Sequence, residues 1–378
     1  MGQPCRPLKD VLAEIADPRQ ARGKRHSLVA LLALVCVATL CGYRSYSAMA
    51  EWGRHYGWEV MRALGFTHPT PPCAATLHRV LRRVDRQAVE AALGRWAEEV
   101  PAALPPTPPQ EEALALDGKT LRGSRKQGAP GTHLLSALAH RLGLTVAQEA
   151  VDDKTNEIGA VQSVWDKLIL DGRVVTVDAL LTQRAVAQAI VERGGDYVLG
   201  AKDNQAHLRQ DLAGLLATPP HLAAPLRSAQ TVDKGHGRLE RRRLSARALL
   251  PGDCDWPGAQ QVFRLERRVI RLKTGEVHTE VLEGLTSRAA AVADPQQVLG
   301  FLRNYWRIEN QSHWVRDVTF DEDRSQVRCG AIPEVMAAFR TTAIGLLRVA
   351  GETNIAAPCR RCAAQPWRAL ALIGIVRE

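Results

Sequence analysis

Two short apolar runs, each followed by an aspartate, constrain the fold of this chain most. Residues 113–116 (ALAL) precede Asp117, and residues 174–177 (VVTV) precede Asp178. Runs of this length and composition, bounded by polar residues, are typical of strands that are buried on both faces of an open α/β sheet. Such sheets place their ligands at the carboxyl ends of their strands. We therefore predict that both aspartates lie at the ligand-binding edge of an α/β fold.

A third carboxylate, Glu309, lies on the apolar face of a predicted helix. At helical spacing the stripe comprises Leu299, Leu302, Trp306, Glu309, His313 and Arg316. A carboxylate drawn toward a core needs a cation, a metal ion or hydrogen-bond donors. Three converging carboxylates would repel one another, and hard divalent cations such as Mg²⁺ or Mn²⁺ favour such an all-oxygen site.

Each carboxylate also has an ordinary structural interpretation. Asp117 precedes Gly118, and Asp-Gly is a common turn pair. Asp178 is suitably placed to cap a helix that begins near Thr182. Glu309 would form a buried ion pair with Arg303, Arg307 or Arg316.

A nucleotide-binding loop is excluded at the first of these positions. The sequence Gly118-Lys119-Thr120 is similar to the end of a phosphate-binding loop, but the full motif needs a glycine at position 113, where Ala113 stands.

The charge and cysteine content restrict the class of partner and the compartment. The formal charge of +10 favours a polyanionic partner, and nucleic acid is favoured over a membrane surface because no basic amphipathic helix dominates the sequence. Many basic proteins nevertheless bind no polyanion.

The 8 cysteines are scattered, which favours reduced thiols in a cytosol. Cys359 and Cys362 have metal-like spacing but no second pair, so a zinc site is not expected.

Composition along the chain predicts six segments. Residues 1–100 form a helical amino-terminal domain, in which the apolar run 28–41 is too short to span a bilayer and is expected to be a buried helix. Residues 101–112 form a proline-rich linker. An α/β core follows in two parts, 113–217 and 291–350, which flank a β-rich insertion at 218–290. Residues 351–378 form a basic tail with no assigned role.

Within the core, the predicted order of elements is that of an RNase H-like α/β domain. A strand ending at Asp117 precedes a hairpin of residues 134–140 and 145–151, a helix at 158–170 and a strand at 173–178. A helix at 182–193, a strand at 197–201 and a helix at 205–217 come next. In this fold the first and fourth strands are neighbours, so Asp117 is expected to lie beside Asp178.

An ordered set of motifs resembles one known family. The segments are LDGKTLRGS (116–124), VTVDALLTQ (175–183), YVLGAKDNQ (197–205), KGHGRLERR (234–242) and NYWRIENQSHWVRDVTFDED (304–323). They are similar to those of the H-repeat-associated transposases, which are DDE enzymes of bacterial insertion sequences. The resemblance extends to IADPRQARGKRHSL near the start and AFRTTAIGLLR near the end. It thus covers nearly the whole chain.

The resemblance implies a function and a set of site residues. Asp117, Asp178 and Glu309 match the catalytic, metal-binding triad, which implies two Mg²⁺ or Mn²⁺ ions. The implied activity is cleavage of DNA at the element ends and transfer of the 3′-hydroxyl to target DNA. The protein would act on DNA as a homodimer or higher oligomer. It would be cytoplasmic, associated with the nucleoid when bound to DNA, and would not interact with membranes. Two alternatives remain open: a catalytically inactive DNA-binding descendant, and a metal-dependent nuclease without strand transfer. The amino-terminal domain would bind DNA ends.

Further residues are predicted to contact DNA, although each is also explained as a solvated charge or an ordinary loop residue. They are Lys119, Arg122, Lys202, Asn204, Gln205, His236, Arg238, Tyr305 and Arg307. Tyr305, Arg307 and Glu309 match the tyrosine-arginine-glutamate signature of related transposases, but Arg316 stands where those families usually have a lysine. His313 and Trp314 are predicted to be core residues.

Overall fold

The computed structural model describes residues 6–20, 24–102, 113–125, 130–151 and 157–377. Residues 103–112, most of the predicted proline-rich linker, lie outside these ranges. The chain forms two compact units. Unit 1 comprises Met1–Thr107, Gly118–Asn156 and Arg307–Glu378, and unit 2 comprises Pro108–Asp117 and Glu157–Trp306. The division falls within one strand, directly after Asp117.

The strands form a sheet with the order β3-β2-β1-β4-β5-β9-β8-β7-β6. The strands β1 (Ala113–Thr120), β4 (Val174–Val177) and β5 (Asp196–Ala201) are parallel, whereas β2 (His133–Ala139) and β3 (Leu144–Val151) form an antiparallel hairpin. The first and fourth strands are neighbours, as predicted. The order of the first five strands confirms the α/β, RNase H-like fold class.

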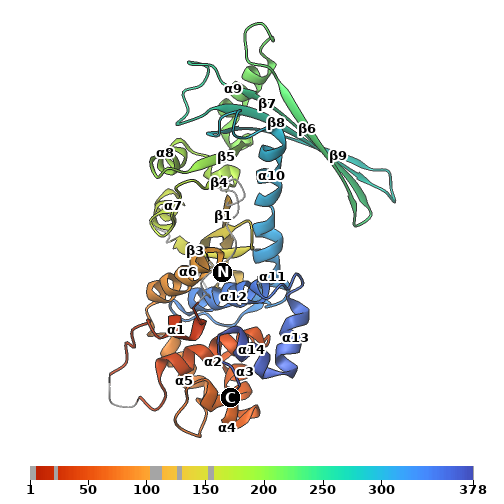
Figure 1. Ribbon diagram of the computed structural model, residues 1–378. Helices are drawn as coiled ribbons and strands as arrows, with labels where there is room; N and C mark the ends of the chain where they lie inside the picture. The colour runs from red at the N-terminus through yellow and green to blue at the C-terminus, as the bar shows by residue number, and fades with distance from the viewer. Residues whose placement is uncertain (1–5, 21–23, 103–112, 126–129, 152–156, 378) are drawn as a thin grey trace. The chain divides into compact units, whose positions relative to one another are not determined.

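In unit 2, helices cover both faces of the parallel strands. Figure 1 shows α7 (Glu157–Trp165) and α8 (Arg184–Glu192) on one side of β4 and β5, and α10 (Pro295–Tyr305) on the other. Since both faces are covered, β4 is apolar or β-branched throughout and wholly buried. Val298 and Leu299 of α10 pack in one core with Val174 and Val198. The predicted helix 158–170 is shorter than expected and ends at Trp165.

The segment predicted as a β-rich insertion forms four long antiparallel strands after α9 (Ala206–Ala217). They are β6 (Arg227–Gly235), β7 (Arg238–Ala248), β8 (Gln261–Arg271) and β9 (Val277–Thr286). Because β9 pairs with β5, the insertion extends the sheet of the core. His236 and Gly237 connect β6 to β7 with φ values of 49° and 72°, which is typical of a tight hairpin turn.

The amino-terminal part of unit 1 consists of helices joined by short connections. Its helices are α1 (Leu8–Leu12), α2 (Leu28–Leu40), α3 (Tyr46–His55), α4 (Gly57–Ala63), α5 (Ala74–Leu81) and α6 (Arg86–Ala102). The helices α3 and α4 are divided at Gly57, whose φ of 74° is left-handed and favours glycine. All of α2 is buried except Val29. No helix among the described residues is long and apolar enough to cross a membrane.

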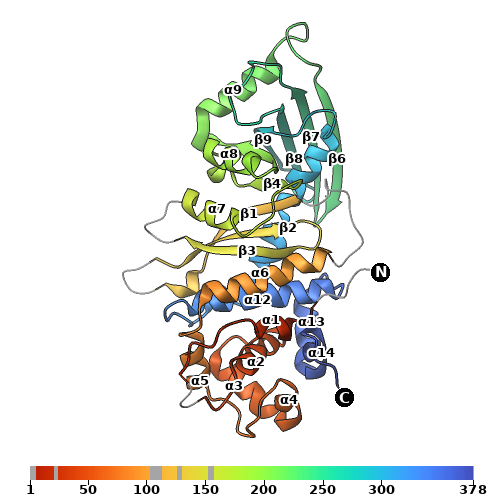
Figure 2. The same ribbon diagram turned by 60° about the vertical axis from the view of Figure 1, so that its left-hand side comes forward.

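The carboxyl-terminal helices of unit 1 complete its core. Figure 2 shows α6 and α12 (Ile332–Val349) side by side along β3, and both contact it. The predicted tail forms two helices, α13 (Ala356–Ala364) and α14 (Pro366–Leu372), that both contact α2. Cys359 and Cys362 are buried there as free thiols, so this part of the tail belongs to the fold.

A buried ion cluster connects α12 to α11 (Trp314–Val318). The carboxylate of Glu322 receives Arg316 Nη2 at 2.7 Å and Arg340 Nη1 at 2.8 Å, and all three side chains are at most 3% exposed. Burial alone would raise the pKa of Glu322, but the two guanidinium groups outweigh it and lower the pKa below 4.5. The arginine at the position of the family's usual lysine therefore has a partner within the core.

Replacing Glu322 by glutamine is expected to destabilise the protein by about 3–5 kcal/mol, because it leaves two buried cations without their counter-charge. Urea unfolding measures this loss. The control, Glu276→Gln, removes a pair with Arg271 in which both side chains are at least 60% exposed, and should cost less than about 1 kcal/mol.

The same cluster gives a pH dependence. Because the pKa of Glu322 is lowered in the folded state, its stabilisation is present above pH 4.5 and is lost as the pH falls below that value. The stability difference between the wild type and Glu322→Gln should therefore shrink in acid. A constant difference from pH 7 to pH 3 would contradict the role of the carboxylate charge.

Candidate metal centre

Asp117 and Asp178 follow directly paired residues on neighbouring parallel strands. Leu116 of β1 pairs with Val177 of β4, so the two aspartates occupy the next position on each strand. Asp117 does not end its strand, since β1 continues to Thr120. Asp178 does end β4, and both carboxylates are half-buried. The prediction that the aspartates lie side by side at this edge agrees with the register.

Asp178 also serves as a cap, as its structural interpretation required. Its Oδ1 accepts a hydrogen bond of 2.7 Å from the backbone N–H of Ala179, at the start of a short 3-10 helix. The same oxygen lies 3.5 Å from Lys202 Nζ. Capping and metal binding are compatible because a carboxylate has several acceptor positions.

Two residues after β5, Asn204 and Gln205, form hydrogen bonds to the loop that follows Asp178. Asn204 donates its side-chain amide to the carbonyl of Ala179 at 3.1 Å, and Gln205 donates to the carbonyl of Thr182. Both residues thereby position this loop. Their predicted contact with DNA stays a prediction.

Glu309 begins a π-helical turn, Glu309–His313, between α10 and α11. Such turns are rare and are often found at functional sites. The Glu309 side chain is 66% exposed. The expectation of a carboxylate drawn into the core is therefore wrong.

The partner of Glu309 is His313, and not one of the three arginines considered from the sequence. Glu309 Oε2 lies 3.7 Å from His313 Nδ1. His313 and, more weakly, Lys119 lower the pKa of Glu309 below 4.5. Arg303 pairs with Asp233, and Arg316 pairs with Glu322.

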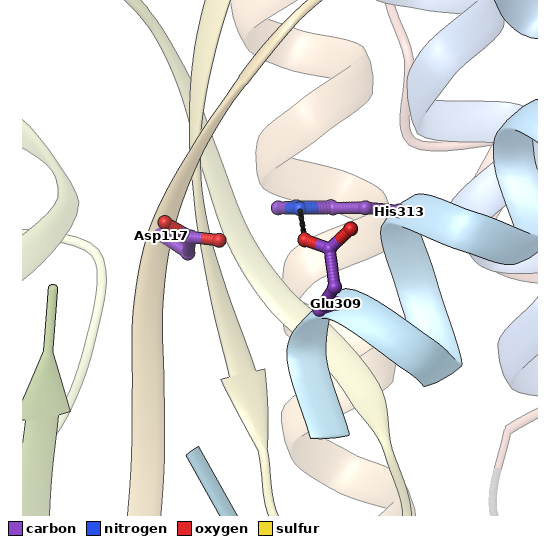
Figure 3. A group of neighbouring side chains, drawn as sticks. All are labelled: Asp117, Glu309 and His313. Atoms are coloured by element: carbon purple, nitrogen blue, oxygen red, sulfur yellow. Dashed lines mark ion pairs between the residues drawn. The ribbon is translucent and has the colours of Figure 1, made fainter. Parts of the chain in front are cut away.

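Asp117 is a third possible ligand in this group. Asp117, Glu309 and His313 each offer one ligand atom, and these atoms lie within 4.8 Å of one another (Figure 3). Two carboxylate oxygens and an imidazole nitrogen form a donor set that fits a divalent cation.

Lys119 and Arg122 follow Asp117 and differ in exposure. Lys119 is 8% exposed, and its Nζ lies 2.7 Å from both carboxylate oxygens of Asp317. Arg122 is 77% exposed and lies 3.8 Å from Asp323. Arg122 is accessible to a ligand, whereas Lys119 would first have to leave Asp317.

Tyr305 and Arg307 lie on either side of the division between the units. In unit 2, Tyr305 lines a cavity of about 540 Å³ together with Asp178. In unit 1, exposed Arg307 donates Nη1 to the carbonyl of His140 at 3.2 Å. Burial, assisted by the charge of Arg307, lowers the pKa of His140 to about 3.

The basic residues near His236 and Arg238 on the insertion differ in exposure. His236, Arg238 and Arg241 are exposed, whereas Arg242 is buried and pairs with Glu240 at 2.6 Å. Arg242 also lies 5.7 Å from the ring centre of Trp306. Arg242 is thus a packing residue of the ribbon, and His236 and Arg238 stay candidates for DNA contact.

The sequence interpretation missed His313 as a possible ligand. It is buried, as predicted, but faces Glu309 from the other end of the π-helical turn. The available signal was its spacing of four residues from Glu309, which places two side chains on one helical face. Trp314, also predicted to be core, is 54% exposed.

An RNase H-like sheet with carboxylates at adjacent strand ends defines a class of metal-dependent enzymes that act on phosphodiesters. Comparison with known proteins narrows this class. Residues 9–97 match the family described as DDE_Tnp_1-associated, and residues 108–346 match the Transposase DDE domain. The chain therefore belongs to the DDE transposase family, as the sequence motifs indicated, and membership implies the use of a divalent metal.

Individual relatives agree with this assignment. The "Uncharacterized protein in dhlA 3'region" of Xanthobacter autotrophicus is 36% identical over 73% of this chain and 92% of its own length. The "H repeat-associated putative transposase YhhI" of Escherichia coli K12 is 26% identical over 90% of each chain. A solved piggyBac transposase synaptic complex with hairpin DNA aligns with 98% of this chain and 82% of its own, at 10% identity and a TM-score of 0.42. That similarity is too low to support a further conclusion.

Arg348 of α12 forms a hydrogen bond to the backbone of the π-helical turn. Its guanidinium donates to the carbonyls of Gln311 and Gly143. Burial lowers the pKa of Arg348 to about 10, so it stays charged at neutral pH. Arg348 thus satisfies a carbonyl in the turn that carries Glu309 and His313.

Arg348→Ala is expected to loosen residues 309–313, because the carbonyl of Gln311 loses its donor. Hydrogen exchange read by mass spectrometry should show reduced protection of this turn. The matched control is Arg324→Ala, whose side chain is 85% exposed. Equal protection in the two variants would show that Arg348 does not support the turn.

Proposed function

We propose that this protein is an active transposase that cuts DNA at the ends of its element and joins the released 3′ ends to target DNA. The observation that carries the proposal is the register of β1 and β4, in which Asp117 and Asp178 occupy neighbouring positions where β4 ends. Glu309 supplies the third carboxylate of the proposed triad.

The chain's own residues would bind and orient the reacting groups. Asp117, Asp178 and Glu309 offer the oxygen ligands that Mg²⁺ and Mn²⁺ prefer. Divalent cations bound there would activate water for attack on a phosphodiester and stabilise the leaving 3′ oxygen. Lys202, which is 65% exposed beside Asp178, is placed to contact a phosphate near the scissile bond.

The cavity of unit 2 next to Asp178 supports a nucleic-acid substrate. It has a volume of about 540 Å³, and its lining includes Lys202, Arg209, Arg267 and Tyr305. Cationic side chains bind phosphates, and aromatic rings provide stacking surfaces for bases. A strand that enters the cavity would therefore meet complementary groups within reach of Asp178.

A basic groove in the amino-terminal helices of unit 1 supports a second DNA contact. Its volume is about 1310 Å³, and Arg25, Arg79 and Arg83 are exposed in its lining. Arg25 precedes α2, whereas Arg79 and Arg83 lie in or just after α5, so the fold brings two basic clusters of the sequence together. We propose that this groove binds the phosphate backbone of the element ends.

The two alternative functions differ from a transposase in their products. An inactive descendant would bind DNA without cutting it, and a nuclease would cut it without joining. The retained triad favours an enzyme over the inactive descendant.

Asp178→Asn is expected to reduce Mg²⁺-dependent cleavage of the inverted repeats flanking its gene more than about 100-fold, because the triad loses a charged ligand. Gel analysis of end-labelled DNA measures the cleavage. The control is Asp211→Asn, an exposed aspartate on α9, which should cleave like the wild type.

Survival of activity in Asp178→Asn would remove this residue from the mechanism. A joining assay with precut ends separates a transposase from a nuclease, because only the transposase inserts a 3′-hydroxyl end into a target plasmid.

The double variant Arg79→Ser with Arg83→Ser is expected to bind end DNA more weakly and to lower the slope of log K against log salt by about 2, since two phosphate contacts are lost. Fluorescence anisotropy at several salt concentrations measures both effects. The matched control is Arg54→Ser with Arg62→Ser, two exposed arginines of the same helical region that do not line the groove.

Two cysteines of the natural chain provide an independent test of the groove. Cys73 lines the groove and is exposed, and a hydrogen bond with Thr76 lowers the pKa of its thiol. Saturating DNA should protect Cys73 from alkylation while exposed Cys329, outside the groove, still reacts. Equal alkylation of Cys73 with and without DNA would refute binding in the groove.

A further inference from the structure

We propose that His313 is a direct nitrogen ligand of the metal ion bound by Asp117 and Glu309, and that this site consequently favours Mn²⁺ over Mg²⁺. The inference rests on the proposed metal-dependent function and extends it, because the predicted triad contains oxygen ligands alone. It names the residue that sets the metal preference of the site.

The separation between Glu309 and His313 suits two ligands of one ion. Two ligand atoms that each lie about 2.1 Å from a metal are about 3–4 Å apart when the ligand–metal–ligand angle is a right angle or wider. Glu309 Oε2 and His313 Nδ1 are 3.7 Å apart, which is longer than a hydrogen bond. The two atoms therefore need little rearrangement to bind the same cation.

Asp117 offers a third ligand atom, which is within 4.8 Å of those of Glu309 and His313 (Figure 3). The resulting set has two oxygens and one nitrogen.

His313 is buried on the turn. It is 4% exposed, whereas Glu309 and Asn310 are exposed. A buried ring has few rotamers available, so it loses little entropy when it binds a metal. Arg348, which holds the carbonyl of Gln311 within the same turn, adds to this rigidity.

The donor set decides which metal is favoured. Mg²⁺ demands oxygen ligands and near-ideal octahedral geometry, whereas imidazole suits transition metals. Mn²⁺ accepts both carboxylate and imidazole and has the same charge as Mg²⁺. A site with one histidine should therefore bind Mn²⁺ more tightly than Mg²⁺.

A different role for His313 is to orient the Glu309 carboxylate from outside the metal's ligand shell. In that case the imidazole would donate a hydrogen bond to Glu309, and no nitrogen would touch the ion. A metal ligand and a hydrogen-bond donor predict different electron paramagnetic resonance spectra of bound Mn²⁺. These two roles of His313 can therefore be distinguished without measuring activity.

The test is pulsed electron paramagnetic resonance of Mn²⁺ bound to the full-length protein. A directly bound imidazole gives a hyperfine coupling from ¹⁴N, and this signal should change to that of ¹⁵N when the protein is made with ¹⁵N-labelled histidine. Labelling leaves the fold intact. Absence of any histidine coupling in a sample that binds Mn²⁺ would overturn the proposal.

Substitution then identifies the histidine and measures its contribution. His313→Gln should lose the coupling and bind Mn²⁺ at least about tenfold more weakly, with a smaller effect on Mg²⁺. The matched control is His26→Gln, because His26 is also buried, at 5% exposed, and lies outside the group. Thermal unfolding without metal confirms that each variant is folded.

The outcomes separate this proposal from the proposed function. If His313→Gln keeps the Mn²⁺ affinity and the coupling while Glu309→Gln loses Mn²⁺, the carboxylate site stands and the nitrogen ligand is refuted. If the wild type binds neither Mn²⁺ nor Mg²⁺, the metal-dependent function fails as well. Loss of the coupling in His313→Gln alone supports the nitrogen ligand.

Discussion

The parallel pairing of β1 with β4 is the constraint on which the candidate site depends. Because side chains alternate along a strand, a slip of one residue would turn every side chain of β4 to the opposite face. The buried run VVTV prevents such a slip, since all four of its residues lie in the core. The same burial that stabilises the sheet therefore decides where Asp178 is placed relative to Asp117.

Much of this arrangement could be predicted from the sequence, because it depends on local patterns with strong physical causes. The apolar runs before Asp117 and Asp178 indicated two buried strands, and the order of the elements indicated their adjacency. The long interval before Glu309 was predicted to contain β-structure, and the paired strands β6 to β9 lie within it. Placing these strands on the edge next to β5 required the structure, since pairing between distant strands leaves no local signal.

The misses concern residues whose environment is set by distant parts of the chain. Helical periodicity placed Glu309 on a buried stripe, but its side chain is 66% exposed at the start of a π-helical turn, which is an insertion into the helix. A pattern with a period of 3.6 residues does not reveal such an insertion. Arg316 was likewise ambiguous, because its partner Glu322 and the second arginine, Arg340, meet only in the folded core.

The contact between Lys202 and Asp178 has a consequence for how the protein acquires its metal. The ammonium group of Lys202, 3.5 Å from Oδ1 of Asp178, offsets part of the negative charge of the two aspartates. It therefore reduces their mutual repulsion without a metal ion. Under the proposed function, metal binding at Asp178 would exchange one cation for another. An exposed lysine is suited to this exchange, since its ammonium group can return to solvent.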